Sequence, residues 1–111
     1  MRYLFLLWGD EAAELALPPA ERQAIVERHM AFTRAIRDED REVSGEPLGP
    51  SRNSLIVRRN GSVTDGPYLE TKEQLGGFYL IECRDGADAA AVAARIPASP
   101  GLEIEIREIP S

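Results

Sequence analysis

His29 is the only histidine in the 111-residue chain, and its side chain is the one best suited to proton transfer. An imidazole has an ordinary pKa of about 6.5, so it can take up or release a proton near neutral pH. It belongs to a set of residues spaced by four, three and four positions: Ile25, His29, Phe32 and Ile36. This spacing places the histidine on the inward stripe of a helix. His29 is then either an acid-base group in a cleft or a hydrogen-bonded core residue, and both interpretations stay open.

The segment from Asp65 to Lys72 carries the other candidate site residues. Asp65 could serve as a second catalytic carboxylate beside His29, but Asp-Gly-Pro is also the sequence that a tight turn requires. We favour the turn and keep the catalytic role as the alternative. The candidate ligand-binding residues that follow are Gly66, Pro67, Tyr68, Glu70 and Lys72. Glu70, Lys72 and Glu73 indicate a charged loop. Because this loop precedes a buried strand, we expect it to overhang a sheet edge or the mouth of a cleft.

Other kinds of site have little support in the sequence. Gly76-Gly77 is not followed by the Lys-Ser or Lys-Thr of a phosphate-binding loop, and indicates a bend or a close backbone approach instead. Cys83 is the only cysteine, so one chain cannot build a thiolate zinc site, and inert packing is the favoured role. His29, Asp65 and Glu70 satisfy only the ligand count of a metal site. We therefore predict no metal and no cofactor.

Charge and length exclude several classes of function. The formal charge of −6, from 13 basic and 19 acidic side chains, opposes binding to a phosphate backbone, so nucleic acid is not an expected partner. The apolar run at residues 3–8 is far shorter than the roughly 20 residues of a membrane-spanning helix. It also lacks a signal-peptide cleavage site. A lone cysteine suits a reducing cytoplasm, and the length fits a single domain over residues 1–111.

Periodicity predicts the strands. Two unbroken apolar runs, residues 3–8 and 78–81, are typical of inner strands that are covered on both faces. Asn60-Gly61 predicts a two-residue type I′ turn, because both central residues of that turn need positive φ. A strand is expected at residues 54–59. We expect residues 62–64 to return beside residues 57–59, and the hairpin to end at the Asp-Gly-Pro sequence.

Helix signals and a final alternating segment complete the pattern. Pro18-Pro19 can open a long helix that runs to about Glu39, since the first helical position needs no backbone N–H. A short strand is expected at residues 43–45. A second helix is expected between Asp85, which could cap it, and Pro97, which stops it. Residues 102–107 alternate apolar and charged side chains, which indicates a strand with one buried face.

The resulting order is strand, helix, short strand, hairpin, strand, helix, strand. This order predicts an α+β fold of the ferredoxin-like βαββαβ type with an inserted β-hairpin, in which both helices cover one face of the sheet. The opposite face also needs cover, because Trp8, Phe78 or Tyr79 and their neighbours carry apolar groups to both sides. Because such a face needs a partner, we predict a two-fold homodimer in which the two sheets meet.

Asp65-Gly66-Pro67-Tyr68, followed by Glu70-Thr71-Lys72-Glu73-Gln74-Leu75-Gly76-Gly77-Phe78-Tyr79, resembles the DGPF family of the YCII-related superfamily. The resemblance extends to residues 3–11, 45–48, 93–97 and 103–107, so it covers nearly the whole chain. It implies a ferredoxin-like α+β fold paired into a dimeric α+β barrel.

The resemblance does not imply one activity. Most members that are similar to this chain have no assigned reaction, some occur beside or fused to sigma factors, and a YCII-like branch includes enzymes of chlorinated aromatic breakdown. A histidine and an aspartate have been suggested as the working pair in YCII-like proteins. His29 resembles their histidine on the first helix, whereas Ile96 stands before Pro97, where they carry the aspartate.

Two functions from different classes follow from these observations. In the first, the protein holds a small organic molecule in a cleft, where His29 performs acid-base chemistry with help from Asp65 or Glu70. In the second, it is a non-catalytic module that binds a regulatory ligand or another protein, and a sigma factor is the partner that the resemblance implies.

Overall fold

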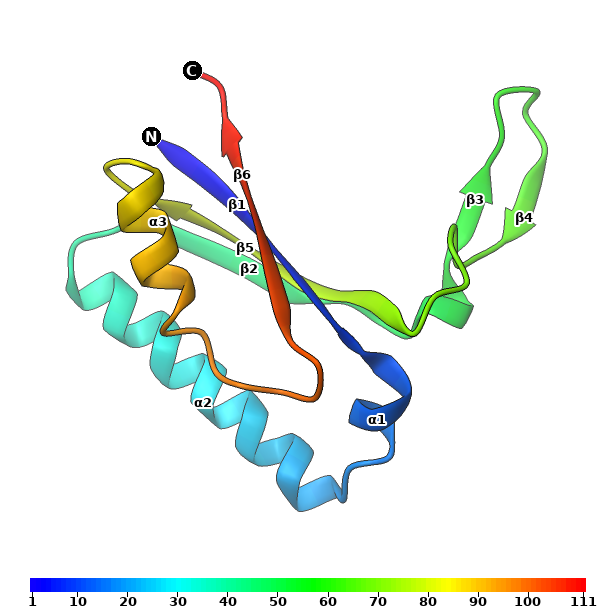
Figure 1. Ribbon diagram of the computed structural model, residues 1–111, viewed down its shortest axis with the longest axis horizontal. Helices are drawn as coiled ribbons and strands as arrows, with labels where there is room; N and C mark the ends of the chain where they lie inside the picture. The colour runs from blue at the N-terminus through cyan, green and yellow to red at the C-terminus, as the bar shows by residue number, and fades with distance from the viewer.

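The computed structural model describes residues 1–111 and shows a mixed α+β fold (Figure 1). Four antiparallel strands form one sheet in the order β2-β5-β1-β6. These strands are β1 (Arg2–Asp10), β2 (Val43–Pro47), β5 (Glu73–Glu82) and β6 (Glu103–Ile109). Two helices, α2 (Pro19–Asp38) and α3 (Gly86–Ala93), lie on one face of the sheet (Figure 1). The predicted α+β class is therefore confirmed.

The central strands β1 and β5 bury alternate side chains. On the face toward the helices the buried residues are Tyr3, Phe5, Tyr79 and Ile81. The large apolar side chains on the opposite face are only half-buried, and we call this surface the open face: Leu4, Leu6, Trp8, Phe78 and Leu80. An unbroken apolar run thus places apolar side chains on both faces of the sheet. A single chain covers only one of them.

Helix α2 begins as the sequence predicts, with Pro18 just before it and Pro19 as its first residue. Its inward stripe buries Ile25, Phe32 and Ile36, so the predicted period of the apolar positions is confirmed. The ring of Phe32 meets the ring of Tyr79 edge-on, with the centroids 5.2 Å apart. This contact fixes α2 against the middle of the sheet.

Aspartate caps begin the other two helices. A short helix, α1 (Glu11–Leu15), occupies the connection after β1, and the side chain of Asp10 accepts a backbone N–H at its first turn with a length of 3.1 Å. Asp85 caps α3 in the same way with a bond of 2.8 Å, as the sequence predicts. Such bonds satisfy amide groups that have no partner within the helix.

A buried ion pair joins α3 to the loop that follows α2. Asp88 is 8% exposed and accepts two bonds from the guanidinium of Arg41, at 2.8 and 3.0 Å. It accepts a third bond from the backbone N–H of Arg84 at 2.9 Å. The pKa of the Asp88 carboxyl is held well below its ordinary value, and the bonds from Arg41 are the main cause. The pair therefore stays charged, with its hydrogen bonds made, at neutral pH.

A two-stranded hairpin stands apart from the main sheet. Strands β3 (Leu55–Val57) and β4 (Val63–Asp65) pair only with each other, and we call residues 55–65 the arm. The arm projects on the side of the sheet away from α2 and α3 (Figure 1). The chain returns as a hairpin that ends at Asp65, as predicted, but the predicted register is wrong: residues 63–65 pair with 55–57, and Val57 lies opposite Val63.

The predicted type I′ turn at the tip of the arm is wrong. Gly61 has a φ of 87°, whereas Asn60 keeps a negative φ. The N–H of Gly61 donates to the carbonyl of Arg58, and the N–H of Arg58 donates to the carbonyl of Ser62. This is a three-residue loop with one left-handed glycine, for which Asn-Gly is equally suited. The sequence signal is the same, but the loop is one residue longer.

Strand β5 starts at Glu73, five residues before the predicted run at 78–81. Glu73 therefore belongs to a strand and not to the charged loop. The predicted close approach at the double glycine occurs within the chain, because a methyl group on Gly77 would lie 3.1 Å from the carbonyl oxygen of Glu46 on β2. No helix in the structure is both long and apolar enough to cross a membrane.

Candidate functional site

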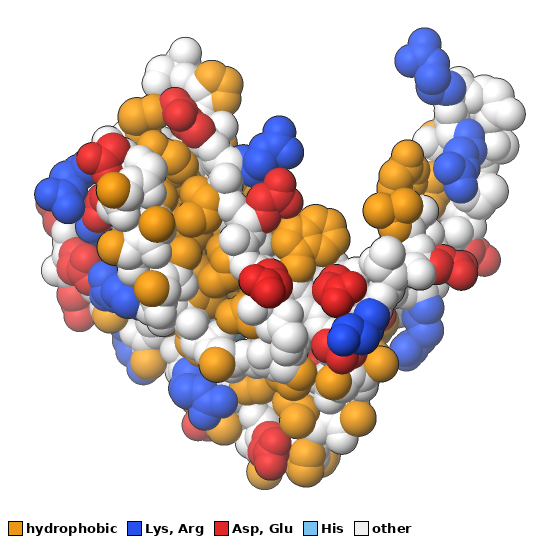
Figure 2. Space-filling model, viewed as in Figure 1, with side chains coloured by type: hydrophobic (Ala, Val, Ile, Leu, Met, Phe, Trp, Pro, Cys, Tyr) orange, Lys and Arg blue, Asp and Glu red, His pale blue; other side chains and the backbone are white.

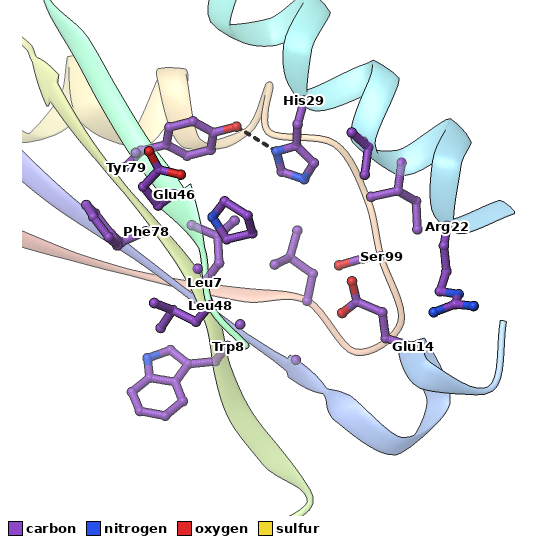
Figure 3. A pocket seen from close by; sticks show the side chains of 18 of the residues that line it. Leu7, Trp8, Glu14, Arg22, His29, Glu46, Leu48, Phe78, Tyr79 and Ser99 are labelled. Atoms are coloured by element: carbon purple, nitrogen blue, oxygen red, sulfur yellow. Dashed lines mark hydrogen bonds between the residues drawn. The ribbon is translucent and has the colours of Figure 1, made fainter. Parts of the chain in front are cut away.

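A cavity of about 560 Å³ lies between α2, helix α1 and the sheet edge formed by β2 and β5. Its apolar walls include Leu7, Ile25, Val26, Pro47 and Leu102. The volume is within the range of about 300–1,000 Å³ that is typical of sites for small molecules. Polar side chains reach the cavity at its two ends, from different elements of the fold (Figure 3).

His29 and Tyr79 form the polar pair at one end of the cavity. The Nδ1 atom of His29 lies 2.7 Å from the Tyr79 hydroxyl, and the two rings stack at an interplanar angle of 21°. The histidine comes from α2 and the tyrosine from β5, so the contact of helix with sheet positions both. The second ring nitrogen of His29, Nε2, points into the cavity (Figure 3). One nitrogen is thus held and the other is available to a ligand.

Burial sets the protonation of this pair. Burial lowers the pKa of His29 below its ordinary value, and the positive charge of Arg28 lowers it further. Burial raises the pKa of the Tyr79 hydroxyl, while a hydrogen bond with Thr33 works in the opposite direction. At neutral pH the site therefore holds an uncharged imidazole and an uncharged phenol. An uncharged imidazole is the form that can accept a proton.

Arg28→Gln is expected to raise the pKa of His29, because the substitution removes the adjacent positive charge. The pKa should still stay below the ordinary value of about 6.5, since burial is the larger cause and is unchanged. A proton NMR titration measures this directly, because His29 supplies the only imidazole signals of the chain. An unchanged or lower pKa in the variant would contradict the electrostatic account.

The other end of the cavity is lined by charged and hydroxyl groups. Glu14 comes from α1, Arg22 from the first turns of α2 and Ser99 from the loop before β6 (Figure 3). A carboxylate, a guanidinium and a hydroxyl can together orient a polar ligand whose apolar part lies against the walls. No spacing pattern in the sequence indicates these residues, because they come from three separate elements.

Most of the site residues that the sequence predicts lie elsewhere in a single chain. The following are not among the residues that line the cavity: Asp65, Gly66, Pro67, Tyr68, Glu70 and Lys72. Asp65 is the last residue of β4 and is exposed. The Nζ atom of Lys72 lies 3.9 Å from a carboxylate oxygen of Asp10, at the far end of β1. The chain therefore brings His29 to the cavity without the segment 65–72.

The position before Pro97 holds no carboxylate and is part of the core. Ile96 is 6% exposed and packs in the main hydrophobic cluster beneath α3. Cys83 is 2% exposed in the same cluster, and burial raises the pKa of its thiol. No three His, Cys, Asp or Glu side chains of the chain gather as metal ligands would.

The fold and the site define a small α+β protein in which a helix and an antiparallel sheet enclose a cavity served by one histidine. A family model of the YCII-related domain matches residues 1–110. The chain is also 33% identical over 86 residues to an uncharacterized protein of Rhizobium meliloti (strain 1021), an alignment that covers 75% of this chain and 69% of that relative. The chain therefore belongs to the YCII-related family.

Proposed function

We propose that the protein binds a small organic molecule in the cavity and that His29 performs acid-base chemistry on it. The observation that carries this proposal is the 2.7 Å contact of His29 with Tyr79 beside a cavity of about 560 Å³. A core histidine would have both ring nitrogens satisfied by the protein, whereas here Nε2 points toward open space (Figure 3). The lowered pKa supports the role of a base at neutral pH.

We further propose that Nδ1 carries the proton of the neutral ring and donates it to the oxygen of Tyr79. The raised pKa of Tyr79 supports an uncharged hydroxyl, whose oxygen can accept the bond from Nδ1. Nε2 then has a free lone pair that faces the ligand. In this arrangement Tyr79 is a positioning residue, since it selects the tautomer and the ring orientation.

A ¹⁵N NMR spectrum above the His29 pKa reads the tautomer. We expect Nε2 to give the signal of an unprotonated nitrogen and Nδ1 that of a protonated one, because only Nδ1 has an internal acceptor. Tyr79→Phe should move both signals toward the mixture of tautomers found for a free imidazole. A spectrum with the proton on Nε2 would contradict the assignment of His29 as a base.

A thermal-shift screen with small organic acids and phenols tests ligand binding. A ligand present at about 100 times its dissociation constant stabilises the native state by roughly 2.7 kcal/mol, which is readily detected. Hits should be weakened by His29→Gln and retained by Glu27→Gln, a matched change at an exposed position of α2 outside the cavity. Hits that both variants retain would place the ligand away from His29.

The alternative is that the same cavity binds a regulatory ligand without turnover. Incubation of each hit with the wild-type protein, followed by mass spectrometry, separates the two functions. A product that forms with wild type and not with His29→Gln supports catalysis, and unchanged hits support the binding module. No contact in a single chain favours a sigma factor, so that partner stays a prediction, which a pull-down would test.

We also propose the finer features of the family resemblance for this chain. The order β2-β5-β1-β6 supports the ferredoxin-like arrangement with the arm as its inserted hairpin, and Asp65-Gly66-Pro67-Tyr68 supports the DGPF grouping. The open face supports a homodimer that forms a barrel from two sheets. Asp65 and the candidate ligand-binding residues between Gly66 and Lys72 do not line the cavity of their own chain. In a dimer they could reach the cavity of the second copy, and their role stays a prediction.

A further inference from the structure

The arm exposes apolar side chains that its own chain does not cover. Leu55, Val57 and Val63 are 67%, 71% and 58% exposed. Val57 and Val63 are paired across the hairpin and Leu55 is two residues further along, so the three side chains lie on one face. An isolated two-stranded hairpin is marginally stable in water. The arm therefore exposes an apolar surface that a partner could cover, and such a contact would stabilise the hairpin.

The base of the arm is fixed to the body. The carboxylate of Glu11 accepts bonds from the N–H and the hydroxyl of Ser51, at 2.9 and 2.6 Å, in a short 3-10 turn, η1 (Ser51–Asn53), that leads into β3. The N–H of Gly66 donates to the carbonyl of Ser54 at 2.8 Å, which closes the neck. The arm thus leaves the body at a defined place.

The arm and the body enclose a V-shaped gap. Apolar side chains show on the side of the arm that faces the gap, and basic side chains show at its outer part (Figure 2). The arm lies on the side of the sheet that carries the open face, so the two apolar surfaces border the same space (Figure 1). A body seated in this gap would cover both.

The charges on the two sides of the gap are complementary. Arg58 and Arg59 lie in the loop at the tip of the arm, and neither has a carboxylate of its own chain within 4.0 Å. On β6, Glu103 and Glu105 lie opposite Trp8 and Leu6, which places them along the margin of the open face. Glu105 accepts a bond from the Trp8 indole at 3.1 Å and lies 3.8 Å from Arg107. Acidic side chains border the gap opposite the arm (Figure 2).

We propose that the arm is a clasp that grips a second copy of the chain. Its apolar face packs on that copy, and Arg58 and Arg59 pair with Glu103 and Glu105 there. The proposal rests on the homodimer proposed above and adds a second contact to it. Two-fold symmetry makes the contact reciprocal, so two arms act in each dimer. Because each copy carries a charge of −6, which opposes association, an opposite-charge contact of this kind favours the dimer.

Excision of the arm tests the clasp. Because Ser54 and Gly66 are hydrogen-bonded at the neck, replacing residues 55–65 by Gly-Gly should close the chain without disturbing the body. Sedimentation equilibrium should show a wild-type dimer whose dissociation constant rises roughly tenfold or more on excision. Fluorescence of Trp8, the only tryptophan, reports independently whether the open face is still covered. Circular dichroism confirms that the excised protein is folded.

The outcomes separate the clasp from the dimer itself. A weaker dimer that still buries Trp8 at high concentration supports the clasp, and an unchanged dissociation constant overturns it while the sheet-to-sheet dimer survives. A wild-type protein that stays monomeric over the whole concentration range overturns both. A stable complex with a different protein, formed through the arm of a monomer, would also overturn the choice of a second copy.

A charge exchange tests the partners of the tip. Arg58→Glu with Arg59→Glu should weaken the dimer, and adding Glu103→Arg with Glu105→Arg should restore much of the lost affinity. Arg28→Glu with Arg34→Glu on α2 is the matched control, since it changes the net charge equally on the helix side of the sheet. Equal weakening by the control, or no recovery in the fourfold variant, would overturn the proposed pairing.

Discussion

Phe32→Ala is expected to lower the free energy of unfolding by about 3–5 kcal/mol, the largest effect of any substitution considered for this protein. Phe32 is 6% exposed, lies in the main core cluster and contacts the Tyr79 ring edge-on at 5.2 Å. Truncation removes most of the apolar surface that α2 buries at this point and leaves a cavity beside Tyr79. Urea denaturation at a fixed protein concentration measures the loss.

The same helix supplies a control for Phe32→Ala. Met30 is 55% exposed, so Met30→Ala should change the free energy of unfolding by no more than about 0.5 kcal/mol. Phe32→Leu keeps apolar contact and should lose less than Phe32→Ala. Because Phe32 supports Tyr79, the alanine variant should also disturb the tautomer signals of His29. A loss near that of Met30→Ala would contradict the packing of α2 on the sheet.

Asp88→Asn is expected to destabilise the protein, because it leaves the guanidinium of Arg41, in a largely buried place, with only the longer 3.4 Å contact to Glu39 as an ion pair. Asparagine can keep one acceptor for the backbone N–H of Arg84, but it cannot receive the paired bonds from Arg41 as a charged group. Arg84→Ala is the control, since the Arg84 side chain is 83% exposed and only its backbone bond is short. Its effect should be small.

The pH dependence of this loss has a definite sign. The folded state holds the pKa of Asp88 below the ordinary value of about 3.9, chiefly through the bonds from Arg41. The stabilisation is therefore fully present above the unfolded pKa and is lost as the pH falls toward the lower folded pKa. The difference in unfolding free energy between wild type and Asp88→Asn should shrink as the pH is lowered from about 6 to 3. A difference that grows toward acid would contradict this assignment.

The fold could be predicted largely from the periodicity of apolar residues and from the residues that begin and end helices and turns. The apolar runs, the Pro18-Pro19 start and the Asp85 cap each act locally, within a few residues of the element that they define. The ends of the strands are harder to predict, because β5 extends back to Glu73 through pairing with β1 and β2. Such pairing depends on residues that are distant in the sequence, so the polar residues at the start of β5 show no local strand pattern.

Only part of the site could be predicted from the sequence. His29 was found because it is the sole imidazole on an apolar stripe, and it does line the cavity. Tyr79 was treated as strand packing, and its bond to Nδ1 depends on the register of α2 over β5. The segment 65–72 is predicted as a site because it is rich in polar side chains. Its actual position at the base of the arm depends on the hydrogen bond between Gly66 and Ser54, which no local pattern predicts.

The narrowest point beside the proposed site suggests a rule for related sequences. A methyl group on Gly45 of β2 would overlap the carbonyl oxygen of Phe78 and would lie 2.7 Å from Cδ1 of Tyr79. Because the closest contact is with the backbone of β5, no substitution at position 79 would make room for a side chain at position 45. Homologues that keep β2 paired with β5 should therefore keep glycine at 45, whichever residue stands at 79.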